Sequence, residues 1–209
     1  MLAYANKHCE MIREALVEYC APTLAGIKTG SICTIQNGSK DIDDEIRELN
    51  GCLVKKGLSL IPLKKTAKTT IVYLYRPDRL KLDLQTPEAQ KILEEKGYPC
   101  RNAGCCVVAL VKRLMRDKDF PHEIGLFLGY PPSDVEGFMK SPWEGVKCCG
   151  CWKVYSNVTR AETIFEQYKK CTEIYRSEKN KGKPLENMIV DTRQECFSGC
   201  DTEHFKKEL

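Results

Sequence analysis

Apolar residues recur every three or four positions along much of the chain, which predicts amphipathic helices. The stretches with this spacing are residues 4–19, 41–56 and 159–178. Thr86-Pro87 and Gly97 predict a further helix over residues 87–97, and residues 103–115, which are apolar nearly all round, predict a buried helix. The second stretch is the clearest, because acidic residues fill its first turn and Gly57 follows its last apolar position. Thr159 and Glu162 form a capping box at the start of the last stretch. We expect Pro22 to end the first helix or to start a new one.

Short apolar runs between these helices have the character of β-strands. The predicted strands are residues 31–35, 58–65, 69–75 and 151–155. The tight loop Thr66-Ala67-Lys68 joins the second run to the third and predicts a hairpin. Pro62 places the first arm of this hairpin near a sheet edge, or at a bulge.

The order of these elements predicts an α+β protein. We expect a small, mostly antiparallel sheet, a helical insert before the last strand and a long C-terminal helix. A ferredoxin-like βαββαβ core is the most economical arrangement, and a general α+β sandwich is the alternative.

Length and polarity indicate one domain. With 209 residues in all, we predict a single α+β domain over residues 1–178 and a polar tail over residues 179–209, where six basic residues balance six acidic ones. No apolar run approaches the roughly 20 residues that cross a bilayer, and the first residues lack the pattern of a secretory signal. We therefore expect a cytoplasmic protein without a membrane partner, and the pattern gives no oligomeric state.

Thirteen cysteines are the main compositional anomaly. Their odd number and the absence of an export signal argue against a disulfide framework and favour reduced thiols or a metal such as zinc or iron. In KCCGCWKVY, Cys148 and Cys151 form a C-x-x-C unit whose two sulfurs could bind one metal ion. Candidates for a second pair are Cys100 with Cys105 or Cys106, and Cys196 with Cys200. Packed free thiols rank ahead of metal ligation, and a dithiol redox pair ranks last because a strand follows the motif.

Basic residues are concentrated in one part of the chain. Residues 53–82 carry eight Lys and Arg against a single acidic residue, a net charge of +7, whereas the whole chain carries +4. This region is a candidate surface for an anionic partner, with Arg76 and Lys28 as contacts to a phosphate or carboxylate. Tyr73 and Tyr75 share a strand face and are candidates to bind the same ligand or to stack on bases. The alternatives are a solvated sheet edge protected by lysines and two core tyrosines.

A second pattern concerns nucleophilic catalysis. If Pro22 starts a new helix, Cys20 lies just before the helix N-terminus, where a thiolate is favoured. His122 is one of only three histidines and would serve as the base. The alternative is a buried thiol and a histidine with a structural role.

Five motifs together resemble a known family. They are CAPTLAGIKTG, LYRP, FPHEIGLFLGYPPSDVEGF, GCWKVY and FEQYKKCTEIY. The combination is similar to an uncharacterised bacterial family, a domain of unknown function met mostly in anaerobic Firmicutes, and the resemblance runs from about Glu10 to about Lys183. It implies a bacterial, cytosolic and anaerobic setting, and it carries no assigned activity.

These patterns leave three functional hypotheses. The leading one is a protein that binds a small anionic ligand or a metal in a cleft between the sheet edge and the helical insert. The alternatives are a Cys/His thiol enzyme and a nucleic-acid-binding adaptor that uses the basic hairpin.

Overall fold

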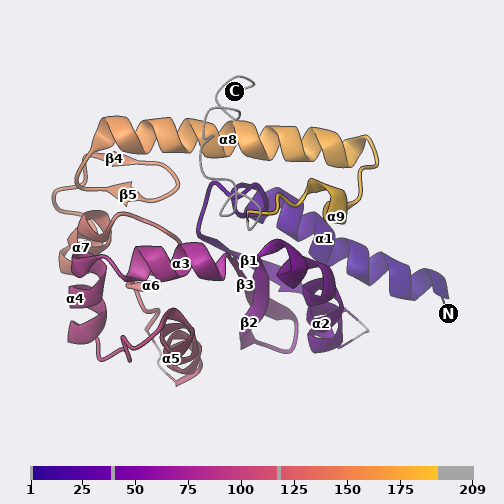
Figure 1. Ribbon diagram of the computed structural model, residues 1–209, viewed down its shortest axis with the longest axis horizontal. Coiled ribbons are helices and arrows are strands. Elements are labelled where there is room, and N and C mark those ends of the chain that lie inside the picture. The colour runs from indigo at the N-terminus through magenta and orange to yellow at the C-terminus, as the bar shows by residue number, and fades with distance from the viewer. Residues whose placement is uncertain (1, 39–40, 117–118, 193–209) are drawn as a thin grey trace.

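The computed structural model describes residues 2–38, 41–116 and 119–192 (Figure 1). The helices are α1 (Leu2–Leu24), α2 (Ile42–Leu53), α3 (Pro77–Leu84), α4 (Pro87–Glu95), α5 (Ala103–Arg116), α6 (Ile124–Phe127), α7 (Pro132–Lys140), α8 (Val158–Asn180) and α9 (Leu185–Met188), with a 3-10 turn η1 (Val54–Lys56). The strands are β1 (Gly30–Gln36), β2 (Ser59–Lys65), β3 (Thr69–Tyr75), β4 (Cys148–Cys149) and β5 (Lys153–Val154). The α+β class, the helical insert α3–α7 and the long helix α8 confirm the sequence prediction.

Three strands form one antiparallel sheet in the order β1-β3-β2. The register of β2 shifts between Pro62 and Lys64, because a proline has no N–H group to donate to the ladder. The ferredoxin-like arrangement does not form, because the last predicted strand pairs only within the separate β4–β5 hairpin. Each of these two strands has two residues, and β5 contacts α7.

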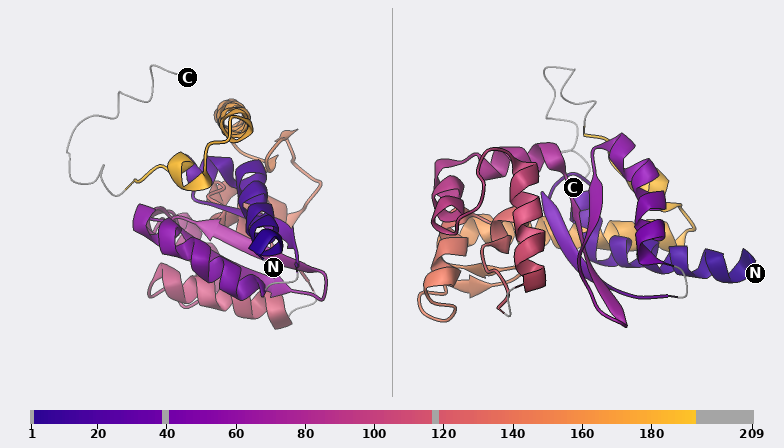
Figure 2. Two further views of the ribbon diagram at one scale, coloured as in Figure 1. Left: turned by 90° about the vertical axis from the view of Figure 1, so that its right-hand side faces the viewer. Right: turned by 90° about the horizontal axis from the view of Figure 1, so that it is seen from below.

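The sheet separates two hydrophobic cores (Figure 2, right). Alternate residues of β3 point to opposite faces, so Val72 and Leu74 belong to one core and Tyr73 to the other. The first core packs against α1, α2, α8 and α9, and we call this the helix side. The second core packs against α3–α7, and we call this the insert side.

Helix α8 spans both sides of the molecule (Figure 1). Its first half lies over the β4–β5 hairpin, and its second half lies beside α1. The chain then returns through α9, and Leu185, Met188 and Ile189 are buried in the first core. Residues 181–192 of the predicted polar tail are therefore packed on the helix side, while residues 193–209, with Cys196 and Cys200, lie outside the described residues.

Local sequence signals explain several element boundaries, but Asn157 caps α8 in place of the predicted Thr159, since its side chain accepts a hydrogen bond from the Arg160 N–H. The Asp41 side chain accepts a hydrogen bond from the Asp43 N–H and caps α2, and Gly57 ends η1 in the left-handed conformation. Pro22 was expected to break the first helix, and this was wrong. Helix α1 continues to Leu24, and the carbonyl of Pro22 accepts hydrogen bonds from the Ile27 and Lys28 N–H groups.

The helices of the described residues are either too short or too polar to span a bilayer.

Candidate functional site

An aromatic cavity of about 560 Å³ lies between α6, α7 and the β4–β5 hairpin. Its volume falls within the range of small-molecule sites. Five ring side chains contribute to its wall: Phe120, His122, Tyr130, Phe138 and Trp152. The cavity therefore lies on the insert side, away from the basic β2–β3 hairpin where the sequence placed the cleft.

A buried carboxylate holds the hairpin against α7. Asp134 is 2% exposed, and its Oδ1 accepts hydrogen bonds from the N–H groups of Tyr155 and Ser156 and from the Ser156 hydroxyl, at 2.7–2.9 Å. Its Oδ2 accepts a bond of 2.8 Å from the Trp152 indole N–H. Four donors offset the cost of burying this charge, so Asp134 fixes the orientation of Trp152 in the cavity wall.

The turn of the hairpin fits closely against α8. A Cβ atom on Gly150 would lie 2.2 Å from the Phe165 ring, so only glycine fits there. The Trp152 ring stacks on Tyr130 with centroids 4.9 Å apart and meets Phe165 edge-on at 4.6 Å. The sequence KCCGCWKVY is thus a turn that delivers an aromatic residue into a cavity wall.

Two polar side chains of the cavity, Lys153 and His122, make few hydrogen bonds to the protein. The Lys153 Nζ donates a hydrogen bond of 2.8 Å to the Pro142 carbonyl and lies 3.5 Å from the centre of the Trp143 ring. Among the described residues, no carboxylate pairs with this ammonium. His122 is exposed and meets Phe138 edge-on with centroids 5.0 Å apart. Among the residues that the structure describes, the ring nitrogens of His122 have no hydrogen-bond partner.

Lys28 lies on the other side of Tyr130. Its Nζ is 5.5 Å from the centre of the Tyr130 ring and 5.6 Å from that of Tyr168 on α8, so it occupies a slot between two aromatic rings. Burial lowers the pKa of Lys28. The Tyr130 hydroxyl donates to the Cys151 carbonyl at 3.2 Å, which joins this slot to the hairpin turn.

Arg76, which the sequence suggested as a surface contact to an anion, lies inside the protein. Its guanidinium is buried and donates five hydrogen bonds to protein oxygens. The acceptors are the carbonyls of Thr23, Leu24, Lys56 and Val190 and the hydroxyl of Thr192. These bonds join the end of α1 to the segment after α9, so the donors of Arg76 are directed at the protein itself.

The two predicted ligand tyrosines lie under the insert. Tyr73 is fully buried and donates a hydrogen bond to the Phe127 carbonyl, and its ring stacks on Tyr75 with centroids 4.6 Å apart. Burial raises the pKa of Tyr73 well above its usual value. Base stacking on this sheet face would require the insert to move away.

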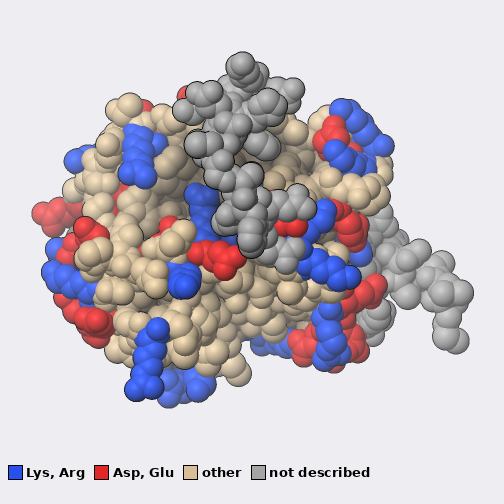
Figure 3. Space-filling model, in the orientation of Figure 1, with Lys and Arg blue, Asp and Glu red and all other residues tan. Residues whose placement is uncertain are grey.

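The basic hairpin is partly neutralised by acids from α2. Lys65 pairs with Asp43 and lies 3.8 Å from Asp41, and the Lys56 ammonium donates to the carbonyls of Glu186 and Ile189. On the face in Figure 3, basic and acidic side chains are interspersed rather than gathered in one basic patch. The binding of nucleic acid to the hairpin stays a prediction.

The structure does not bring Cys20 and His122 together. Cys20 lies inside the continuous helix α1, in the first core, and its Sγ is 3.9 Å from the Sγ of Cys33. The hydrogen bond to Cys33 and burial both raise the pKa of Cys20, which opposes thiolate formation. His122 lines the aromatic cavity on the insert side, so the thiol-enzyme hypothesis has no support from this arrangement.

The candidate metal ligands are distributed over two places. Cys148 is half-buried in β4 and Cys151 is exposed in the turn, whereas Cys100 and Cys105 lie before and within α5. In the described ranges, no three His, Cys, Asp or Glu side chains lie close enough together to hold a metal ion. Zinc or iron ligation by Cys148 and Cys151 stays a prediction that the arrangement does not favour.

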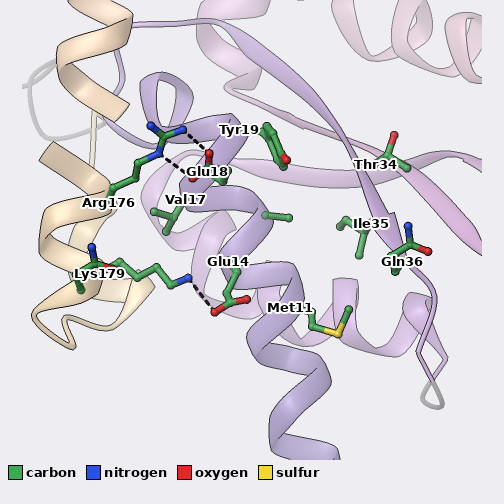
Figure 4. A pocket seen from close by; sticks show the side chains of 12 residues that line it. Met11, Glu14, Val17, Glu18, Tyr19, Thr34, Ile35, Gln36, Arg176 and Lys179 are labelled. Atoms are coloured by element: carbon green, nitrogen blue, oxygen red, sulfur yellow. Dashed lines mark hydrogen bonds and ion pairs between the residues drawn. The ribbon is translucent and has the colours of Figure 1, made fainter. Parts of the chain in front are cut away.

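A second hollow, of about 490 Å³, lies between α1, β1 and the second half of α8 (Figure 4). Arg176 and Lys179 of α8 point toward α1 and pair with Glu18 and Glu14, the second pair at 2.8 Å. The hydrogen bond from Arg176 lowers the pKa of Glu18. The charged side chains of this hollow therefore pair with each other and join α8 to α1. Since these charges are already paired, the aromatic cavity is the better candidate for a ligand site.

Together, the fold and the site define a small α+β protein with a ligand-sized aromatic cavity between a helical insert and a β-hairpin. The chain belongs to the family described as "Protein of unknown function (DUF3793)", whose model matches residues 16–189. This match confirms the resemblance to a domain of unknown function. No curated protein and no solved structure matched the chain.

Sequence reasoning missed Asp134, and it singled out Trp152 and Lys153 by their motif without giving them a role. Asp134 is one of two acids in SDVEGFMK, and the four donors that bond to it lie more than fifteen positions away. Trp152 and Lys153 stood next to the C-x-x-C unit, which drew attention to the sulfurs instead. The useful signal was the aromatic residue directly after the turn.

Proposed function

We propose that this protein binds a small ligand that combines a planar apolar ring with an acidic group, in the aromatic cavity beside α7. The observation that supports it is a ligand-sized cavity walled by five ring side chains and containing a lysine that has no carboxylate partner among the described residues. Sites for small molecules combine apolar walls with a few convergent polar groups in this way.

The walls favour a flat, apolar body for the ligand. Trp152 and Tyr130 offer stacked ring faces, and Phe138 offers a third surface next to His122. Because aromatic pairs prefer offset or edge-on contacts at 4.5–7 Å, a ring of the ligand would pack against the outer surfaces of these side chains.

The charges favour an acid. Asp134 is the carboxylate of the cavity lining, and both its oxygens already accept hydrogen bonds from the hairpin. Lys153 retains N–H donors beyond the one given to Pro142, and His122 adds ring nitrogens at the same cavity. A carboxylate, sulfonate or phosphate would therefore meet the positive Lys153, while the Asp134 carboxylate is already engaged by donors of the hairpin.

Naphthalene-1-sulfonate is a suitable probe, with uncharged naphthalene-1-methanol for comparison. A Trp143→Phe protein leaves Trp152 as the reporting tryptophan, and its fluorescence should saturate as the sulfonate is added. The sulfonate should bind about tenfold more tightly than the alcohol, since a hydrogen bond to a charged group contributes about 1.5–3 kcal/mol.

Lys153→Met should remove this preference and leave the weaker binding of the alcohol unchanged. Lys64→Met, at an exposed lysine of β2, is the matched control and should bind like the parent protein. The proposal is wrong if no aromatic acid gives a saturable signal, or if Lys153→Met binds the sulfonate as tightly as Lys64→Met does.

A further inference from the structure

Lys28 occupies a site that the aromatic cavity does not use. It follows α1 in the turn before β1, while its two ring neighbours come from the α6–α7 loop and from α8. Cys151 of the hairpin turn lies close enough for its charge state to affect Lys28. Four segments that are remote in sequence thus converge on one amine.

The surroundings of this amine are unusual for a lysine. In the described part of the chain, no carboxylate pairs with it and no oxygen accepts a hydrogen bond from it. Two aromatic faces flank it, and its residue is only partly exposed. An ammonium in such a place loses water without gaining acceptors, which favours the neutral, nucleophilic amine.

We propose that Lys28 is a nucleophilic lysine that captures a small aldehyde or keto acid as an imine in the slot between Tyr130 and Tyr168. The lone pair of the neutral amine attacks the carbonyl carbon and forms the N–C bond. The carbonyl oxygen leaves as water after proton transfer, and a C=N bond remains. No oxidant or reductant takes part in this step.

The neighbouring charges fit an acid group on the carbonyl compound. Arg79 of α3 donates to the Gly26 carbonyl at 2.6 Å, and its positive charge also reaches Tyr168. Asp83, on the same helix, is engaged by the Thr29 hydroxyl.

Besides Arg79 and Asp83 of α3, the titratable groups around Lys28 are thiols and phenols that stay neutral near pH 7. Burial raises the pKa of Tyr130 and Tyr168, the latter to about 12. The other neighbours are Cys20 of α1, whose pKa is also raised, and Cys151. No group in this set supplies a negative charge at neutral pH that would restore the ordinary pKa of the amine.

Reductive trapping tests the proposal. The wild-type protein is treated at pH 7 with glyoxylate and sodium cyanoborohydride, which converts an imine into a stable secondary amine. Peptide mass spectrometry then compares the labelling rate of Lys28 with that of exposed Lys64. We expect Lys28 to react several-fold faster at pH 7, and the ratio to shrink as the pH is raised past the lowered pKa of Lys28.

Two variants refine the test. Tyr168→Phe keeps the ring and should keep the fast labelling, whereas Tyr168→Ala opens the slot to water and should slow Lys28 to the rate of Lys64. If Lys28 of the wild-type protein is labelled no faster than Lys64 at pH 7, the proposal is overturned. This experiment needs no ligand in the aromatic cavity, so its failure would leave the proposed function standing.

Discussion

The two sides of the sheet treat their charged groups differently. On the helix side, Arg76 gives five hydrogen bonds to the protein, Lys56 donates to two carbonyls, and Arg13 pairs with Glu186 at 2.9 Å. On the insert side, Lys153 gives one hydrogen bond and Lys28 faces aromatic rings. The first pattern joins segments of the chain, and the second leaves cations available beside apolar surfaces.

This contrast separates cations that join parts of the fold from those that we propose to bind ligands. A buried guanidinium is stable only when its donors are satisfied, so a fully bonded arginine is a device for holding the fold together. A lysine that is held in place by ring contacts keeps donors that a ligand can use. Basic residues of one chain therefore have different surroundings, which depend on burial and on the hydrogen-bond acceptors that the fold brings to each of them.

The largest effect is expected from removing the buried arginine. Arg76→Met removes one donor each from the carbonyls of Thr23, Leu24 and Val190 and should lower the free energy of unfolding by about 3–5 kcal/mol. Urea denaturation followed by circular dichroism measures this loss. Arg79→Met is the matched control, because exposed Arg79 gives a single hydrogen bond, and it should cost less than about 1 kcal/mol. Equal losses for the two variants would contradict the structural role of Arg76.

The sequence could predict helices and strands, but it could not predict the hydrogen-bond acceptors of Arg76. The helical spacing and the hairpin loop are local signals, and they placed α2, the β2–β3 hairpin and α8 correctly. Arg76 contacts residues 53 positions before it and 116 after it, so its role depends on how the chain closes on itself. Its position next to a basic segment suggested an anion, because sequence shows charge but not burial.

The next effect concerns the link between α7 and the hairpin. Asp134→Asn replaces an acceptor with an N–H₂ group at a place where four donors converge, and it should cost about 2–3 kcal/mol. The same change should alter the fluorescence of Trp152, whose indole donates to this carboxylate. Asp78→Asn, at an exposed acid of α3, serves as the control. Unchanged fluorescence in Asp134→Asn would show that the carboxylate does not position Trp152.

A smaller effect is expected at the tip of the hairpin. Gly150→Ala places a methyl group against the Phe165 ring and should cost about 1–3 kcal/mol, with weaker binding of aromatic acids because Trp152 shifts. Gly51→Ala in α2 has open space around the new methyl group and should instead stabilise the protein by about 0.5–1 kcal/mol. Thermal unfolding of both variants shows whether the melting temperature falls for Gly150→Ala and rises for Gly51→Ala. Stabilisation by Gly150→Ala would mean that the turn does not lie against α8.

The candidate site shows the same limit of sequence reasoning. The motifs GCWKVY and FPHEIGLFLGYPPSDVEGF both supply residues of the cavity, so the right segments were identified. The chemistry was assigned to sulfur because a C-x-x-C spacing is a recognisable signal, whereas an aromatic wall has none. Its members Phe120, Tyr130 and Trp152 meet only after the hairpin has folded back on the insert.

The smallest effect concerns the far end of α8, on the helix side. Hydrogen bonds from Lys181 and Lys183 lower the pKa of Glu178 to about 2 from its ordinary 4.5. A carboxyl group whose pKa is lowered in the folded state contributes stability above pH 4.5, and that contribution is lost as the pH falls toward 2. Since the group is exposed, the contribution is small, and we expect Glu178→Gln to lower the urea midpoint slightly at pH 6 but hardly at all near pH 2. An NMR titration of the Glu178 carboxyl measures the pKa directly, with exposed Glu166 of the same helix as the reference. An ordinary midpoint near 4.5 for Glu178 would show that the hydrogen bonds from Lys181 and Lys183 do not form in solution.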